Sequence, residues 1–348
     1  MPATKAYAAQ SAESPIAPFE INRREPGLHD VLFEVIFCGI CHTDIHMSRG
    51  HIPGCMFPMV PGHEVVGKVT QVGSAVTRHK VGDIVGVGCM VDSCRTCCEC
   101  QAGEEHFCEA GMVGTYNALE RDGKTPTFGG YSKRMTVDEN FVLKISTKLD
   151  PAAAAPLLCA GITTYSPLKH WKVGKGSKVG VIGLGGLGHM AVKLAAAMGA
   201  DVTVLSTSDG KRADAARLGA KNFAVTKDPE TFGRLANHFD LIISTVSGGI
   251  NYDAYVSLLK RDGTLVMLGV PDGPMEVNVF GLLMKRKSVS ASLIGGIRET
   301  QEMLDFCAEH GIVSDIEMIA IDKVNEAYER ILKSDVRYRF VIDMATLN

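Results

Sequence analysis

The stretch "KVGVIGLGGLGHMAVKLAAAMGADVTVLSTS", residues 178–208, decides the fold of half of the chain. An apolar strand runs into Gly183, Gly185 and Gly188 at G-x-G-x-x-G spacing, and a helical pattern and a second apolar strand follow. In such a turn the first glycine makes the bend, the second lets the backbone approach a pyrophosphate, and the third allows close helix–strand packing. The strand–turn–helix–strand context therefore predicts a dinucleotide-binding unit with a doubly wound parallel sheet.

The end of the second strand indicates which dinucleotide is bound. An NAD site has Asp or Glu at this point, which binds the ribose hydroxyls. Here Ser206 and Thr207 occupy it, and Lys211 and Arg212 follow one turn later. Hydroxyls and cations bind a 2′-phosphate, which a carboxylate would repel. Asp209 lies past the serines and is a poor substitute for the acid, so the pattern favours NADP(H).

The chain changes character about halfway along. Residues 1–150 contain short β-type runs separated by glycine and proline, which predicts an irregular, mostly β domain. Residues 151–290 alternate apolar strands with helical periods, which predicts an α/β domain with a parallel sheet. The residues after 290 mix both kinds of element. They form a third unit or fold back onto the first domain, and their periodicity leaves both possibilities open.

Composition narrows the class of protein. With 348 residues, 46% hydrophobic and 22% charged, the chain fits a globular enzyme of about two domains. A formal net charge of −3 with mixed signs gives no reason to expect nucleic acid or a membrane surface as a partner. No signal peptide or membrane-spanning stretch is visible, so a cytoplasmic location is expected. In that compartment eleven cysteines are more typical of ligands or buried small side chains than of disulfides.

Five cysteines crowd into one short stretch of the mostly β half. Cys94, Cys97, Cys100 and Cys108 have C-x2-C-x2-C-x7-C spacing, and four thiolates would close a tetrahedral structural zinc site completely. An iron–sulfur cluster is the rival, but its pattern needs a fourth cysteine three residues on, followed by proline, and neither is present. Cys98 is left over, either as a bystander or as an oxidation-sensitive thiol.

A second set of metal-ligand residues is scattered along the chain. Cys41 lies in "CGICHTDIH", His63 and Glu64 lie in "VPGHE", and Cys159 lies in "LLCAGITTY". Cys, His and Cys are the protein half of a catalytic zinc site that keeps a fourth position open. Spacing alone makes this a weak signal, because a lone buried cysteine is more often packing than a ligand.

Taken together, the motifs resemble a known family along essentially the whole chain. They are similar to the zinc-dependent medium-chain alcohol dehydrogenases, and most of all to the cinnamyl-alcohol-dehydrogenase group and its broad-range bacterial aldehyde reductases. The matching segments include "GICHTDIH", "VPGHEVVGKV", "APLLCAGITTYSPL", "VGVIGLGGLGHM" and "VNEAYERILKSDVRYRFVID". The resemblance implies a GroES-like, mostly β catalytic domain (residues 1–152 and 296–348) and a Rossmann NADP-binding domain (residues 153–295).

The resemblance also assigns roles to single residues. Cys41, His63 and Cys159 would bind the catalytic zinc, with Glu64 as an alternating or nearby ligand. Thr43 would pass the proton of the reaction and His46 would carry it toward solvent, while Asp44 would hydrogen-bond His63. The implied cofactor contacts are His42, Thr163, Gly183, Gly185, Gly186, Leu187, Gly188, Ser206, Thr207, Ser208 and Lys211.

The implied function is reversible hydride transfer between NADP(H) and a zinc-bound primary alcohol or aldehyde, over a broad range of aliphatic and aromatic substrates. Two Zn²⁺ ions are expected per subunit, one catalytic and one structural. The implied partners are small alcohols and aldehydes and further copies of the chain, in a homodimer or homotetramer.

One stretch departs from the family pattern. Where many relatives have an acidic residue and a tryptophan, this chain has His51 and Ile52, and Phe57 occupies a tyrosine position. Loss of an aromatic wall should widen the pocket and weaken stacking on flat aryl substrates. Ile52 and Phe57 are therefore predicted to line the substrate pocket.

Other functions compete with this one. A polyol or secondary-alcohol dehydrogenase of the same superfamily often replaces the second cysteine ligand with a carboxylate, whereas this chain has Cys159. A zinc-free quinone reductase would lack both cysteine sets. A non-catalytic NADPH-binding protein on this scaffold would be expected to lose Thr43, His63 or Cys159, and all three are present.

Overall fold

The protein is described by a computed structural model of residues 3–271 and 273–348. The chain divides into two compact units, Met1–Ile162 with Gly295–Asn348 and Thr163–Ile294. The predicted domain limits, after residues 152 and 295, lie ten residues before the first division and one residue after the second.

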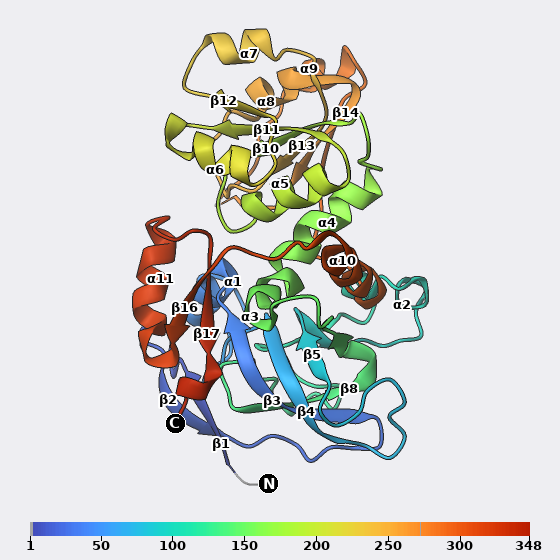
Figure 1. Ribbon diagram of the computed structural model, residues 1–348, viewed down its shortest axis with the longest axis vertical. Helices are drawn as coiled ribbons and strands as arrows, with labels where there is room; N and C mark the ends of the chain where they lie inside the picture. The colour runs from blue at the N-terminus through green and yellow to red at the C-terminus, as the bar shows by residue number, and fades with distance from the viewer. Residues whose placement is uncertain (1–2, 272) are drawn as a thin grey trace. The chain divides into compact units, whose positions relative to one another are not determined.

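The first unit is built on a seven-stranded sheet. Its strand order is β16-β17-β3-β4-β5-β9, and β8 pairs with β3 beside this path (Figure 1). Two further pairs, β1-β2 and β6-β7, form small sheets of their own. The strands are β1 (Thr4–Ala8), β2 (Ala17–Ile21), β3 (Asp30–Gly39), β4 (Val65–Val72), β5 (Ile84–Val87), β6 (Met90–Asp92), β7 (Val113–Gly114), β8 (Arg134–Asp138), β9 (Leu143–Lys144), β16 (Ile316–Ala320) and β17 (Arg339–Asp343).

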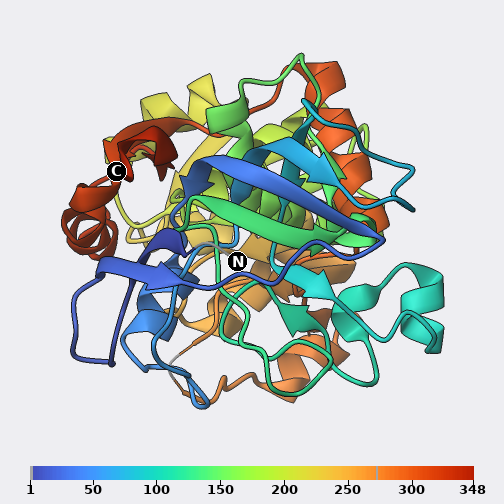
Figure 2. The same ribbon diagram turned by 90° about the horizontal axis from the view of Figure 1, so that it is seen from below.

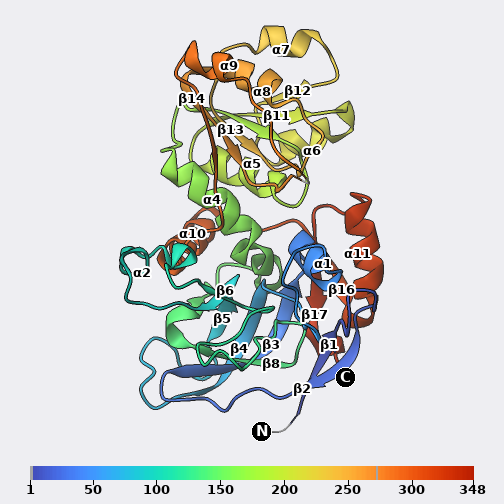
Figure 3. The ribbon, with the colours of Figure 1, turned by 180° about the vertical axis from the view of Figure 1, so that it is seen from behind.

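The C-terminal residues fold back onto this sheet. Strand β17 pairs antiparallel with β3, with Val341 opposite Gly39, and β16 pairs parallel with β17. Figure 3 shows the red C-terminal segment beside the blue β3 strand. The apolar strand "RFVID" supplies the reason, because four of its five residues are buried in the sheet. The two possibilities that periodicity left open are thereby decided in favour of the first unit.

Short helices complete the first unit. Helix α11 buries Val324, Ala327, Tyr328 and Ile331, whose spacing places them on one face. The segment around α2, drawn in teal, projects beyond the strands of the sheet (Figure 2). The helices are α1 (His42–Ser48), α2 (Cys98–Ala102), α3 (Pro151–Ala154), α10 (Ile297–His310) and α11 (Val324–Leu332), with α4 (Ala160–His170) crossing the division between the units. The 3₁₀ turns of this unit are η1 (Glu105–Phe107), η2 (Glu139–Phe141), η3 (Ala155–Leu158), η5 (Ile321–Lys323) and η6 (Met344–Thr346).

The second unit is a six-stranded, fully parallel sheet, as the alternating pattern predicted. Its order is β12-β11-β10-β13-β14-β15, so the order reverses between β10 and β13. Ligands of such sheets bind outside the carboxyl ends of the strands at this reversal. The elements are β10 (Lys178–Ile182), α5 (Gly188–Ala197), β11 (Asp201–Ser206), η4 (Asp209–Lys211), α6 (Arg212–Arg217), β12 (Asn222–Val225), α7 (Glu230–Arg234), β13 (Phe239–Ser244), α8 (Tyr252–Leu258), β14 (Leu259–Met267), α9 (Val279–Leu283) and β15 (Ser288–Ala291).

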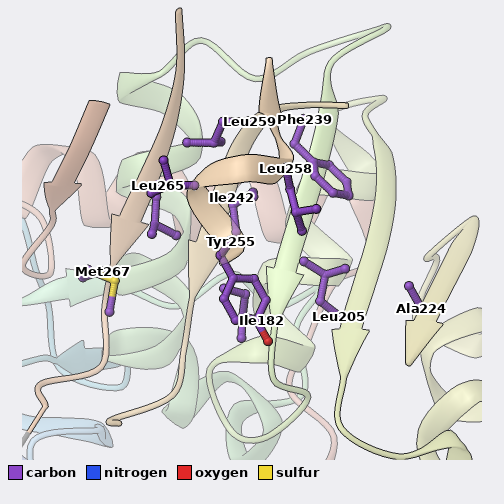
Figure 4. Close-up of a cluster of buried hydrophobic side chains, with 11 residues drawn as sticks. Ile182, Leu205, Ala224, Phe239, Ile242, Tyr255, Leu258, Leu259, Leu265 and Met267 are labelled. Carbon is purple, nitrogen blue, oxygen red and sulfur yellow. The ribbon is translucent and has the colours of Figure 1, made fainter. Parts of the chain in front are cut away.

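Apolar side chains on the strands of this unit form its core. Ile242 and Leu265 meet Tyr255 and Leu258 of α8, and none of these four side chains is more than 5% exposed (Figure 4). Ile182 of β10 and Leu205 of β11 belong to the same cluster, and burial of this kind contributes about 25 cal/mol per Å² of apolar surface. Among the described residues, no helix is both long and apolar enough to cross a membrane.

Candidate functional site

The four cysteines of the projecting segment come together in one loop. One ligand atom from each of Cys94, Cys97, Cys100 and Cys108 lies within 4.8 Å of all the others. The Sγ atoms of Cys94 and Cys100 are 3.9 Å apart. A left-handed residue, Arg95 with φ +63°, turns the chain sharply between the first two cysteines. Four sulfur donors at this separation fit a structural Zn²⁺ ion.

Backbone N–H groups of this loop donate hydrogen bonds to two of its sulfur atoms. The N–H of Cys97 donates to Cys94 Sγ at 3.3 Å, and the N–H of Cys94 donates to Cys108 Sγ at the same distance. Amide donors from Thr96 and Cys97 lower the pKa of Cys94 to about 6. Hydrogen bonds to the charged form favour it, so these amides stabilise the thiolate of Cys94, the form that binds a metal.

Cys98 does not belong to this group of four sulfurs, and its thiol contacts two carboxylates instead. Its exposed thiol donates to Glu109 Oε1 at 3.2 Å and to Glu99 Oε1 at 3.5 Å. These carboxylates raise the pKa of Cys98 to about 11, because they repel a thiolate. Since the thiolate is the reactive form, the carboxylates suppress the reactivity of this thiol, and the arrangement favours the bystander interpretation.

The scattered ligand residues converge as well. Cys41, His63, Glu64 and Cys159 each offer an atom, and these atoms lie within 4.8 Å of one another. The thiols of Cys41 and Cys159 are 3.9 Å apart although 118 residues separate them. All four side chains are buried. We call these four residues the assembled cluster, and Cys94, Cys97, Cys100 and Cys108 the loop cluster.

Three different segments carry the assembled cluster. Cys41 caps the N-terminus of α1 directly after β3, and His63 and Glu64 precede β4, which pairs with β3. Cys159 lies between η3 and α4. The pairing of β3 with β4 brings the first two segments together, and the packing of η3 on β3 and β4 brings the third. The sheet of the first unit therefore builds this site.

Asp44 orients the histidine of the assembled cluster. It is fully buried and accepts hydrogen bonds from the backbone N–H groups of Cys41 at 2.8 Å and Gly62 at 3.1 Å. His63 Nδ1 lies 3.3 Å from Asp44 Oδ1. Burial lowers the pKa of His63, but the charge of Asp44 outweighs it and raises the pKa overall. With Nδ1 engaged, Nε2 remains as the metal-ligating nitrogen.

Sequence reasoning missed the partner of Glu64. Arg339 of β17 forms a buried ion pair with Glu64 Oε1, while Glu64 Oε2 and Arg339 Nε have no hydrogen-bond partner among the described residues. Burial raises the pKa of Glu64 to about 8, against the attraction of Arg339. A side chain at Gly39 would overlap Glu64 Oε2, so only glycine leaves room there. A buried acceptor without a donor fits a carboxylate that can turn toward a metal.

A second residue that sequence reasoning missed is Cys89. Its thiol hydrogen-bonds that of Cys159, which lowers the pKa of Cys89. In the sequence Cys89 lies only five residues before Cys94, so proximity suggests the loop cluster. The bend after β5 instead directs it to the assembled cluster.

The predicted proton-transfer residues lie on α1. Thr43 Oγ1 is 3.6 Å from Cys41 Sγ, and the rings of His42 and His46 stack with centroids 6.1 Å apart. His46 Nδ1 lies 3.2 Å from His51 Nδ1. Ile52 and Phe57 follow in the same loop, with Ile52 exposed and Phe57 half-buried. Their place in a substrate pocket remains a prediction.

The glycine turn of the second unit has the three properties that the motif requires. Gly183, at the end of β10, has φ +86°, where other residues are strained. A side chain at Gly185 would meet no atom within 4 Å, which leaves the backbone open to a ligand. A side chain at Gly188 would overlap the carbonyl oxygen of Gly183, so close packing excludes it. Gly186 and Leu187 complete the turn before α5, half-buried.

The residues predicted to bind a 2′-phosphate lie at the end of β11. Ser206 ends the strand, and Thr207 and Ser208 follow it, exposed. Lys211 Nζ donates to the carbonyl oxygen of Leu184 at 2.7 Å, which places the ammonium beside the glycine turn. Asp209, the rejected acid, pairs with Arg212 at 2.6 Å.

Two predicted cofactor contacts lie outside these two stretches, His42 on α1 and Thr163 on α4. Thr163 is buried, at the first position of the second unit. Its contact with a cofactor remains a prediction, as does that of His42.

Both halves of the chain match known families. Residues 27–147 match the family described as "Alcohol dehydrogenase GroES-like domain", and residues 186–309 match "Zinc-binding dehydrogenase". The chain is 61% identical to NADP-dependent alcohol dehydrogenase C 1 of Mycolicibacterium smegmatis, over 100% of this chain and 99% of that protein. It is 53% identical to aldehyde reductase YahK of Escherichia coli, over 99% of both chains.

Solved structures show the same similarity. The cinnamyl alcohol dehydrogenase of Helicobacter pylori in complex with NADP(H) has a TM-score of 0.92 and 40% identity, over 99% of this chain and 98% of that one. A cinnamyl alcohol dehydrogenase of Sorghum bicolor has a TM-score of 0.95 and 45% identity, again over 99% and 98%. The fold class predicted from the sequence, a GroES-like unit with a Rossmann unit, is confirmed.

Proposed function

Because the chain belongs to the zinc-dependent medium-chain alcohol dehydrogenases, we propose that the assembled cluster is its catalytic centre. The enzyme interconverts alcohols and aldehydes with NADP(H) as the hydride carrier. We assign Cys41, His63 and Cys159 as ligands of the catalytic zinc and Glu64 as a residue that exchanges with them. A zinc ion held there supplies Lewis-acid polarisation of the substrate oxygen.

One observation carries the assignment: three ligand segments far apart in sequence converge, and a buried carboxylate orients the histidine among them. Two thiols and an imidazole within 4.8 Å of one another leave a tetrahedral metal one position for substrate. The loop cluster, with four sulfurs, leaves none. We therefore assign the reaction to the assembled cluster and propose that the loop cluster holds the structural zinc.

The residues of α1 handle the proton in this proposal. Thr43 lies beside Cys41, so its hydroxyl can accept a proton from an alcohol or give one to the product of aldehyde reduction. His46 lies one turn further along the helix and takes the proton outward. Asp44 takes no part in this transfer, because its oxygens are occupied by His63 and two backbone amides.

The second unit binds the cofactor. The open backbone at Gly185 admits the pyrophosphate, which then lies at the N-terminus of α5. Ser206, Thr207, Ser208 and Lys211 supply hydroxyls and one cation for the 2′-phosphate of NADP(H). The ammonium of Lys211 already lies beside the glycine turn, which supports this role.

A panel of substrates tests the function. We expect NADPH oxidation with butanal and benzaldehyde, with slower turnover of cinnamaldehyde, because Ile52 provides less surface for stacking than tryptophan. NADH should support much less activity. A zinc chelator should abolish turnover. Absence of activity with every aldehyde, with zinc bound and NADPH present, would refute the proposal.

We also propose that the enzyme is a homo-oligomer whose contact lies on the second unit. Val270, Val279, Phe280, Leu283 and Met284 are each more than half exposed, and patches of this kind mark protein interfaces. The adjacent strand β15 pairs only with β14 among the described strands, so its other edge can pair with a second copy. Phe280→Asp should shift the mass measured by light scattering toward the monomer, and an unchanged mass would contradict the contact.

A cytoplasmic location is part of the same proposal. None of the eleven cysteines forms a disulfide, and ten of them lie in or next to the two clusters or are buried thiols of the first unit. A reducing compartment keeps such ligands as thiols.

A further inference from the structure

Three imidazoles form a row on α1 and the turn that follows it. His42 and His46 are four residues apart on the helix, so they share one face, and their rings stack. The ring of His51 follows, with its centroid 5.5 Å from that of His46. The two Nδ1 atoms of this last pair are 3.2 Å apart, within hydrogen-bond distance.

The backbone holds His51 in this place. Helix α1 ends at Ser48, and Gly50 with φ +66° reverses the chain. The N–H of His51 then donates to the carbonyl oxygen of His46 at 2.9 Å. The closed turn thus fixes the backbone of His51 beside His46, within reach of its ring.

The two rings of the pair differ in their exposure to solvent. His46 is half-buried, while His51 is exposed. Two neutral imidazoles can share a hydrogen bond between Nδ1 atoms only if one carries the proton and the other accepts it. Each ring then has its Nε2 free for a second transfer, so the pair can conduct a proton.

We propose that His51 is the solvent-side member of a two-histidine proton relay, passing protons between water and His46. The inference rests on the proposed function, in which His46 carries the proton of the reaction. His51 acts through His46 and is a positioning and relay residue, not one that touches substrate. It takes the place at which many relatives have an acidic residue.

The transfers balance. Aldehyde reduction consumes one proton, along with the hydride of NADPH. Water protonates His51 Nε2, the Nδ1 proton of His51 moves to His46 Nδ1, and the Nε2 proton of His46 moves toward Thr43. Each ring ends neutral with its proton on the opposite nitrogen, and the hydrogen bond between the Nδ1 atoms is reversed. Alcohol oxidation runs these transfers backward, and exchange with water resets the rings.

The pair has three polar or charged neighbours, His42, Arg49 and Cys55. His42 faces it from α1, and the thiol of Cys55, in the loop that follows, donates to Ile52 O at 3.1 Å. Arg49, in the turn, pairs with Glu329 of α11 at 2.6 Å, so its positive charge is compensated.

The experiment compares the zinc-loaded wild-type enzyme with His51→Gln and His51→Ala, and with His310→Ala as a matched control. His310 is an exposed histidine at the end of α10 whose Nδ1 hydrogen-bonds within its own helix, to Phe306 O. Two rates are measured in weak buffer. One is turnover of butanal with NADPH as a function of pH, and the other is proton release on mixing with NADP⁺, followed with a pH indicator.

We expect both rates to fall about tenfold in the His51 variants, less than the 100-fold or more that a directly acting acid–base contributes. Added imidazole should restore them, whereas His310→Ala should match the wild type. Wild-type rates and pH profile in His51→Gln would overturn the relay. So would slow rates that imidazole does not restore, because they would indicate a structural role. A wild-type enzyme inactive with every aldehyde would instead refute the proposed function.

Discussion

The loop cluster and the assembled cluster lie in the same unit and both contain cysteine ligands, yet they are built in opposite ways. The loop cluster takes its ligands from residues 94–108, and its own backbone amides point at its sulfurs. The assembled cluster spans 118 residues between its two thiols and needs β3, β4 and η3 in place. A short loop can wrap a metal completely, whereas ligands from separate segments can leave one position open.

Because of this difference, we expect the loss of each cluster to have a different effect. Loss of the loop cluster should loosen one projecting segment, because its ligands tie that segment to itself. Loss of the assembled cluster should remove chemistry while the apolar sheet keeps the unit folded. The following predictions test this contrast.

The largest effect is expected at the assembled cluster. Cys159→Ala should lower kcat for butanal by about 1,000-fold or more, equivalent to about 4 kcal/mol, because one ligand of the catalytic metal is lost. The variant should bind one zinc fewer per chain by elemental analysis and should unfold close to the wild-type temperature. Unchanged turnover would show that the chemistry lies elsewhere.

The next effect concerns the ion pair behind that cluster. Arg339→Met leaves the Glu64 carboxylate buried without a counter-ion, and removal of one partner of such a pair costs about 3–5 kcal/mol. Urea unfolding of the single variant measures the loss. The double variant Glu64→Gln/Arg339→Met removes both charges and should recover part of it. A single variant as stable as the wild type would mean that Glu64 does not need Arg339.

A smaller effect is expected at the loop cluster. Cys97→Ala should lower stability by about 2 kcal/mol, or about 4–8 °C in the unfolding temperature, since one of four structural ligands is removed. Cys98→Ser is the matched control one residue away and should change neither zinc content nor unfolding. A fully stable Cys97→Ala that has lost hydride transfer selectively would reverse the roles of the two clusters.

The smallest effect is expected in the second unit, at another site built from one local stretch. Lys211→Glu should raise KM for NADPH about tenfold, because a charge-assisted hydrogen bond to phosphate becomes a repulsion. KM for NADH should change little, since NADH carries no 2′-phosphate. Steady-state kinetics with both cofactors measure the ratio, and equal effects would contradict the assignment of the phosphate site.

Local patterns predicted much of this molecule. The G-x-G-x-x-G turn, the alternation of strands and helices and the loop cluster all depend on residues close together in the chain, where spacing carries geometric information. The left-handed Gly183 and the closely packed Gly188 lie where the motif requires them. The role of Cys98 could not be predicted from the sequence, because only the structure shows that its thiol contacts two carboxylates.

Local sequence patterns could not predict the contacts between distant residues that the sheets bring together. The ligand set of the assembled cluster came from family resemblance, since spacing alone was weak. Nothing near Arg339 in the sequence points to Glu64, 275 residues away. Cys89 lies next to the loop cluster in sequence but beside Cys159 in space.

The sequence by itself determined the two kinds of domain, the dinucleotide turn and the existence of a four-cysteine metal loop. Each of these features depends on interactions between residues that are close together in the sequence. Only the tertiary structure showed that the C-terminal strand β17 pairs with β3, that Arg339 pairs with Glu64 and that His51 meets His46. Those contacts depend on strand pairing and on a turn closed by a backbone hydrogen bond. The pairing of distant strands is stabilised by the burial of apolar surface, which occurs only when the whole unit folds.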